Sequence, residues 1–184
     1  YTAFNHSYRT KRHFIAPKPE DIFRLFLNGQ YNDPLFYKNN GVYSGFIYRT
    51  KFAKIREAIM TGTRFIFIHS DMGNGKTACI NELQYRLSWE NIHIFELSNA
   101  DSQKISEEIS AIYSLSQSAA VLILIEDYTN YMDVLQKLAL LDNGKVQFVF
   151  TARSALNYNK MPLILDQFAA KEGSAAVFDI NRLE

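Results

Sequence analysis

The chain has a single cysteine, Cys79, and therefore no disulfide can form within it. This cysteine use suits a reducing compartment, so we expect a cytoplasmic protein in which Cys79 is a small buried packing residue. Long apolar runs are also lacking, because the longest uninterrupted run, residues 119–125, is far too short to cross a bilayer. No secretory signal stands at the start of the sequence. These absences exclude a disulfide scaffold and argue against a membrane protein.

The chain also has little net charge. Its formal value is only +1, but the charges are unevenly distributed. Residues 1–64 hold 11 Lys and Arg against 4 Asp and Glu, whereas residues 65–184 hold 9 against 15. A basic first third is compatible with contact to nucleic acid, to a membrane surface or to an acidic partner domain. A solvated face or a linker is the simpler interpretation, and we favour it.

Residues 1–41 form an N-terminal leader that is basic and aromatic but has no clear hydrophobic period. Turn-forming residues recur throughout it, and a short helix over about residues 19–27 is the one element that we expect there. Such aromatic density is unusual in a disordered tail, so we expect the leader to pack on the core or on an upstream domain. A single α/β domain then occupies residues 42–184. Because the chain begins at Tyr1 and ends just after a strand-like segment, we expect a piece of a longer protein.

The strongest signal lies in residues 64–87, which have the pattern of an apolar strand, a glycine-bearing loop and an amphipathic helix. Glycines in such a loop permit positive φ, and the N-terminus of the following helix offers N–H donors to an anion. Lys76 would reach the β- and γ-phosphates of a nucleotide, and the Thr77 hydroxyl would ligate Mg²⁺. The pattern is that of a Walker A motif with serine in place of its first glycine; a structural turn with a solvated lysine is the alternative. The predicted nucleotide-binding residues are Ser70, Asp71, Met72, Gly73, Asn74, Gly75, Lys76, Thr77 and Ala78.

Helical and strand patterns alternate along the rest of the chain. A helix over residues 49–60 precedes the first strand, and Pro162 marks the first turn of the last helix. Alternation at this spacing demands a parallel sheet with right-handed crossovers. The later helices are expected at about 102–115, 131–141 and 162–171, and the later strands at 92–97, 121–125, 146–151 and 175–180.

Two acids, Glu126 and Asp127, follow the most apolar of these strands. Nucleotide hydrolysis needs one carboxylate to hold Mg²⁺ through water and another to polarise the attacking water, both at the carboxyl end of a strand near the phosphate loop. Glutamate precedes aspartate here, so the two roles are not assigned between them. In the alternative interpretation Asp127 only caps the next turn.

The strand over residues 146–151 closes in Thr151-Ala152-Arg153. An apolar strand ending in Thr-x-Arg, after a Walker A motif and paired acids, resembles the STAND class of signalling P-loop ATPases, which includes NACHT and NB-ARC modules. The resemblance covers about residues 42–184. It implies an α/β P-loop NTPase fold, a three-layer sandwich in which a five-stranded parallel sheet of order 5-1-4-3-2 has helices on both faces.

The resemblance also implies roles for individual residues. Arg153 would sense the γ-phosphate with Thr151 as its neighbour, a task suited to a fixed guanidinium, although a surface arginine is the alternative. Arg49 resembles the arginine of a segment whose backbone touches adenine. The implied cofactors are ATP or ADP with Mg²⁺, and the metal would be held by Thr77, Glu126 and Asp127. The implied catalytic residues are Lys76, Glu126, Asp127 and Arg153.

The function that follows from this resemblance is an ATP-binding, slowly hydrolysing switch of a larger protein, in defence or stress signalling. Its partners would be helical, winged-helix and effector domains and, with nucleotide, further copies of the same protein. An AAA+-like ATPase acting on nucleic acid is an alternative, but no arginine finger or second sensor can be assigned. A small-molecule kinase would need an arginine-rich lid, and residues 153–160 offer too few basic groups. A non-hydrolysing nucleotide-binding scaffold is suggested only by Ser70 and Glu126.

Overall fold

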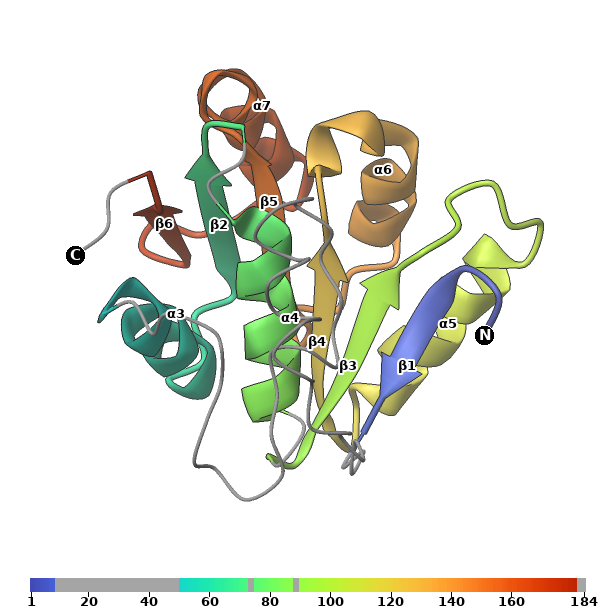
Figure 1. Cartoon of the computed structure of the whole chain (residues 1–184). Helices are drawn as coiled ribbons and strands as arrows, with labels where there is room; N and C mark the ends of the chain where they lie inside the picture. Colours follow the sequence, from blue (N-terminus) through green and yellow to red (C-terminus); the bar gives the residue numbers. More distant parts are fainter. Residues whose placement is uncertain (9–49, 73–74, 88–89, 182–184) are drawn as a thin grey trace, which may run out of the picture.

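The computed structural model describes residues 1–8, 50–72, 75–87 and 90–181 of the chain, and strands alternate with helices through most of this part (Figure 1). None of the helices among these residues has the length and apolar character needed to span a membrane. The elements are β1 (Phe4–Ser7), α3 (Thr50–Met60), β2 (Phe65–Ser70), α4 (Lys76–Leu87), β3 (Ile92–Leu97), α5 (Ile105–Leu115), β4 (Ala120–Ile125), η1 (Tyr128–Asn130), α6 (Met132–Leu140), β5 (Gln147–Arg153), α7 (Ser154–Gln167) and β6 (Ala175–Asp179).

One sheet joins the six described strands in the order β1-β3-β4-β5-β2-β6. Strands β2 to β6 pair in parallel, whereas β1 runs antiparallel to β3, with Phe4 opposite Leu97. The predicted number of five strands is therefore wrong, because residues 4–7 of the leader add an edge strand. The sheet order differs from the prediction by this strand. Counted along the chain and read from β6, the five parallel strands follow the order 5-1-4-3-2.

β1 is short and contains polar residues, so no strand pattern marks it in the sequence. Its start is held by Glu108 of α5, which accepts hydrogen bonds from Thr2 and from the backbone N–H groups of Ala3 (2.9 Å) and Phe4 (3.3 Å). Burial raises the pKa of Glu108, but these bonds to its charged form outweigh burial and lower the pKa. Residues 9–41, which include the helix expected at 19–27, lie outside the described part of the chain.

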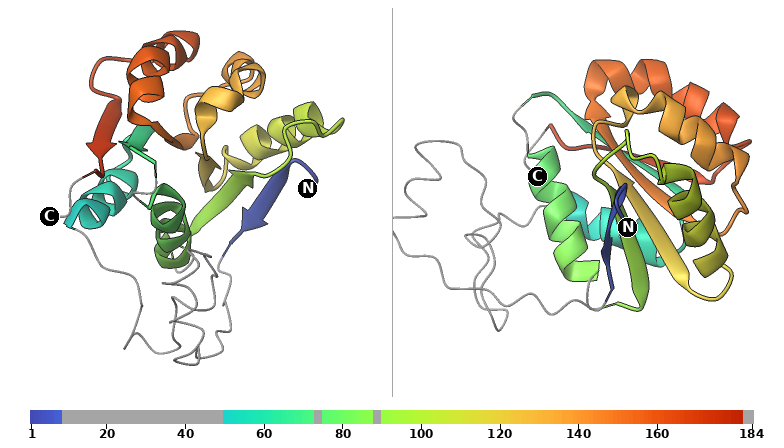
Figure 2. Two further views of the ribbon diagram at one scale, coloured as in Figure 1. Left: turned by 45° about the horizontal axis from the view of Figure 1, so that its top comes forward. Right: turned by 90° about the vertical axis from the view of Figure 1, so that its right-hand side faces the viewer.

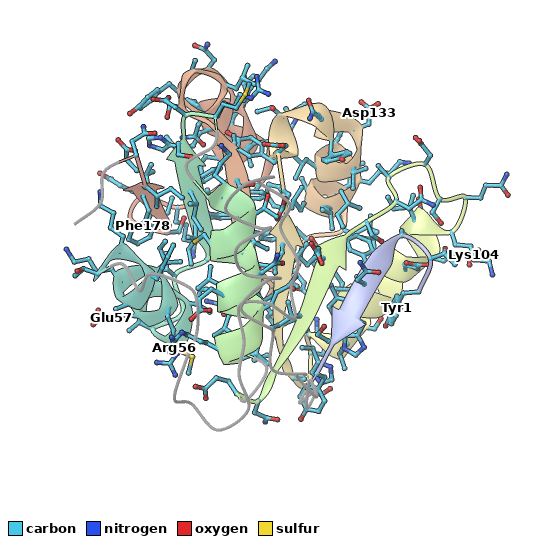
Figure 3. The ribbon with its side chains drawn as sticks, viewed as in Figure 1. Tyr1, Arg56, Glu57, Lys104, Asp133 and Phe178 are labelled. Atoms are coloured by element: carbon cyan, nitrogen blue, oxygen red, sulfur yellow. The ribbon has the colours of Figure 1, made fainter. Side chains whose placement is uncertain are left out.

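Successive residues of each parallel strand point to opposite faces of the sheet and serve two cores. In β2, for example, Phe65 and Phe67 lie in one core and Ile66 lies in the other. Helices α5, α6 and α7 cover the first core, and α3 and α4 cover the second (Figure 2). The α/β class with helices on both faces of the sheet is thereby confirmed. Tyr1 and Phe178 lie toward opposite edges of the sheet (Figure 3).

Helix α7 departs from the sequence prediction, because it begins at Ser154, directly after Arg153, and carries Pro162 in its interior. The expected helix over residues 162–171 is wrong in both bounds. The inward face of α7 includes Asn157 and Ile164, both fully buried. A buried asparagine interrupts the apolar periodicity of the first two turns, so the sequence pattern became visible only near the proline.

Candidate functional site

The predicted site residues lie at the carboxyl edge of three neighbouring strands. β2 leads into the phosphate loop, β5 lies beside β2 and ends at Arg153, and β4 lies beside β5 and leads into Glu126 (Figure 1). In the β2–β5 register Ser70 is opposite Arg153. Residues that are far apart in the sequence are thus brought to one edge because all three strands run in the same direction.

The phosphate loop connects β2 to α4, as the sequence predicts. Gly75 has φ of +83°, a conformation that side chains rarely adopt, and its carbonyl accepts the hydrogen bond from Cys79 N–H at 2.9 Å. The N–H groups of the first turn of α4 have no partner within the helix and can face an anion. Asp71 and Met72 are exposed. Gly73 and Asn74, the side chain of Ala78, and Arg49 lie outside the described part of the chain.

The ammonium of Lys76 is turned back onto the start of the loop. Its Nζ donates to the carbonyl of Ser70 (3.3 Å), to Ser70 Oγ (3.2 Å) and to the carbonyl of Asp71 (3.1 Å). Ser70 is fully buried, so its hydroxyl is a fixed part of this acceptor set. The serine at the position of the first Walker A glycine thus supplies an additional contact to the lysine.

Thr77 meets the first of the two acids. Its Oγ1 donates to Glu126 Oε2 at 3.2 Å, which places the hydroxyl of α4 against the carboxylate that follows β4. Burial raises the pKa of Glu126, and the nearby carboxylates of Glu96 and Asp127 add to this; the Thr77 bond and Lys76 oppose it. The structure therefore brings Thr77 together with Glu126.

Asp127 is oriented by its backbone. Its φ is +45° and its N–H donates to Thr151 Oγ1 at 3.1 Å, while the carboxylate is exposed. Asp127 precedes η1, but its side chain makes no capping hydrogen bond, so the capping interpretation receives no support. Thr151 is buried and links the acidic turn to β5, the strand that carries Arg153. Arg153 itself is exposed at the end of β5.

The oxygen donors fit a magnesium ion that is bound together with nucleotide. A hydroxyl and carboxylates are the ligands that Mg²⁺ accepts, and Thr77 and Glu126 already lie in contact. In the described part of the chain no group of three or more His, Cys, Asp or Glu side chains is arranged to hold a metal. A cation here would therefore need phosphate oxygens and water to complete its coordination.

Sequence reasoning missed two residues at this edge. Glu96 lies two residues after Ile94, which packs in the core under α4, and its charge acts on Glu126. An acid near the end of an apolar strand was the available signal for Glu96. Asn181, which follows β6, accepts a hydrogen bond from the backbone N–H of Asp71 at 2.6 Å. No sequence pattern marks Asn181.

Comparisons with known proteins give structural similarity alone. No protein-family model matches the sequence, and no curated protein matches it. The similar solved structures include PCH-2 from C. elegans (16% identity, 73% of this chain and 40% of that chain, TM-score 0.46). They also include ORC1 from Aeropyrum pernix in complex with DNA (14% identity, 75% of this chain and 47% of that chain, TM-score 0.46). A third is a STAND protein with a tetratricopeptide repeat sensor from Pyrococcus horikoshii (13% identity, 76% of this chain and 24% of that chain, TM-score 0.43).

The chain spans less than half the length of each of these three proteins. At such identities and TM-scores the comparison assigns neither a family nor an activity. The class is given by the molecule itself: a parallel sheet flanked by helices, with a glycine-bearing loop between β2 and α4, has the architecture of a P-loop NTPase domain.

Proposed function

We propose that this chain is an ATP-binding, slowly hydrolysing switch module of a larger STAND-like protein, related to NACHT and NB-ARC modules and acting in defence or stress signalling. The observation that carries the proposal is the contact between Thr77 and Glu126, beside Lys76 and at the same edge as Arg153. Lys76 and Thr77 belong to α4, Glu126 directly follows β4, and Arg153 ends β5. These are the kinds of group that binding and cleavage of a triphosphate require.

In the nucleotide-bound form, Lys76 leaves the Ser70 and Asp71 acceptors and donates to the β- and γ-phosphates. The N-terminus of α4 adds its unpaired N–H groups to the same anion. Mg²⁺, when bound with nucleotide, neutralises phosphate charge and would be held by Thr77 and, through water, by the acids Glu126 and Asp127. Glu126 lies on the metal side of the site because it touches Thr77.

Asp127 is then the carboxylate that accepts a proton from the attacking water. It is exposed, so packing does not hold it against a substrate, and slow turnover is the expected consequence. Arg153 donates to the γ-phosphate and loses this contact when the γ-phosphate leaves. Loss of this contact changes the arrangement of the helical, winged-helix and effector domains of the whole protein. It also changes the nucleotide-dependent association of the protein with further copies of itself. We place this activity in the cytoplasm.

The alternatives fit the site less well. A small-molecule kinase needs a basic lid, and of residues 153–160, which were considered for that lid, Arg153 ends β5 and the others form the first half of helix α7. An AAA+-like action on nucleic acid was suggested by the basic leader, most of which lies outside the described residues. Neither alternative gains a specific contact from the structure.

Replacing Glu126 tests the proposed chemistry. In Glu126→Gln the Thr77 hydroxyl keeps an oxygen acceptor but the metal side loses a negative charge, so we expect ATP hydrolysis to fall at least about tenfold. The Mg²⁺ concentration needed for half-maximal ATP binding should rise. Glu107→Gln, which changes an exposed acid of α5, is the matched control. Unchanged hydrolysis and unchanged Mg²⁺ dependence in Glu126→Gln would refute the proposed role of this acid.

A further inference from the structure

One side chain outside the proposed catalytic groups reaches both the phosphate loop and the turn that follows Arg153. Asn181 accepts at Oδ1 a hydrogen bond from the backbone N–H of Asp71 (2.6 Å), and its Nδ2 donates to Ser154 Oγ (3.3 Å). Asp71 is the first loop residue after β2, and Ser154 directly follows Arg153. A single amide thus joins two parts of the site that belong to different elements.

The backbone that presents this amide is itself fixed. Ile180 is fully buried, and its N–H donates to the carbonyl of His69 at 3.0 Å. The N–H of Asn181 donates to Asp179 Oδ1 at 2.9 Å. Because β6 pairs with β2 up to the Asp179–His69 position, the end of β6 is anchored to the strand that leads into the phosphate loop.

His69 closes the network on the β2 side. Its ring is 2% exposed, and Nδ1 lies 3.1 Å from Ser154 Oγ, the same hydroxyl that Asn181 contacts. Ser154 therefore joins the end of β2 and Asn181, two residues beyond β6, to the start of α7. A displacement of any one of these three segments must strain hydrogen bonds to the other two.

We propose that Asn181 is a positioning residue of the nucleotide site, which holds the entrance of the phosphate loop and the Arg153 turn in one arrangement and couples this arrangement to the chain leaving β6. The coupling rests on the proposed nucleotide-binding function, whereas the positioning of Asp71 does not. If the Asn181 contacts favour the nucleotide-bound form of the loop, bound nucleotide must favour the Asn181 contacts to the same extent.

Hydrogen exchange in nucleotide-free protein tests the positioning by itself. In Asn181→Ala the Asp71 amide loses its acceptor, so its exchange should be at least about tenfold faster than in the wild-type chain. Asn159→Ala is the matched control, because Asn159 is exposed and its amide bonds to the Ala155 carbonyl within α7. Asn181→Asp retains an oxygen acceptor and should restore slow exchange at Asp71. Wild-type exchange of the Asp71 amide in Asn181→Ala would overturn the proposal.

The same variants measured with Mg-ATP test the coupling. Nucleotide should slow exchange of the Ile180 amide in the wild-type chain and in Asn159→Ala, but much less in Asn181→Ala. ATP should bind Asn181→Ala about fivefold more weakly, because the side-chain hydrogen bonds to Asp71 and Ser154 are lost. If the wild-type chain binds ATP while Asn181→Ala shows the same affinity and the same Ile180 protection, the coupling is wrong and the proposed function stands. If no variant binds nucleotide but Asp71 exchange responds as expected, the proposed function fails and the positioning stands.

Discussion

Arg153 is the residue on which the proposed switch depends. It ends β5 opposite Ser70, so its guanidinium starts from the strand next to the phosphate loop. Arg153→Ala should weaken ATP binding by about tenfold or more, because a charge-assisted hydrogen bond is lost, and should change ADP affinity little. Calorimetric titration with both nucleotides measures this difference. Arg56→Ala, which removes a surface arginine paired with Glu90, is the control, and equal loss for ATP and ADP would contradict a sensor role.

At the scale of single residues, the sequence predicts candidate site residues where the pattern lies in consecutive positions. Lys76 and Thr77 were assigned from their spacing to the glycines, and Glu126 from its place after an apolar strand. The back-turned ammonium of Lys76 could not be foreseen, because it depends on the carbonyl directions at Ser70 and Asp71. Asn181 was missed because its two contacts arise only when β6 packs beside β2.

Among the elements, β1 pairs with β3 and has its start bonded to one side chain of α5, Glu108. Glu108→Ala removes the acceptor for Thr2, Ala3 and Phe4, and we expect a loss of about 1–3 kcal/mol in the free energy of unfolding. Amides of residues 4–7 should exchange faster than those of β4 in this variant. Glu107→Ala, at the exposed neighbouring position, should leave both quantities near the wild-type values; equal protection of residues 4–7 in both variants would refute this account.

The parallel strands and the helices on their faces followed from the sequence because burial on both faces produces continuous branched or aromatic runs. The strand expected at residues 92–97 has those bounds in the structure, and α4 ends at Leu87, where the strand, loop and helix pattern over residues 64–87 ends. β1 has no such run, since Phe4 is its one apolar residue and the three residues after it are polar. α7 was misplaced because Asn157 occupies a core position that an apolar residue would normally mark.

The stability of the whole molecule should decrease in mild acid. Loss of solvation lowers the pKa of the buried His69 and, at more accessible positions, of His6 and His93, and the charge of His93 lowers the pKa of His6 further. The unfolded chain therefore binds more protons than the folded one below about pH 6.5. Their contribution is complete above that pH and is lost as the pH falls. The raised pKa of Glu126 acts in the opposite sense, but at lower pH, because a glutamate carboxyl ordinarily titrates below a histidine.

Urea unfolding at pH 7.5, 6.5 and 5.5 measures this effect. For the buried His69 the slope is at most about 1.4 kcal/mol per pH unit between its unfolded and folded pKa values. The free energy of unfolding should decrease as the pH is lowered in the wild-type chain, and it should decrease less in His69→Asn. A free energy that stays constant or rises toward pH 5.5 would contradict the assignment of a neutral, buried His69.

Binding of nucleotide by this chain is the most direct test of the central claim. Titration calorimetry with Mg-ATP and Mg-ADP should show binding by the wild-type chain and an affinity at least about tenfold lower for Lys76→Ala, which removes the charge that meets the phosphates. Lys145→Ala, an exposed lysine bonded to Gln117, should bind as the wild type does. A folded wild-type chain without affinity for either nucleotide, or a Lys76→Ala chain that binds as tightly as the wild type, would contradict the account.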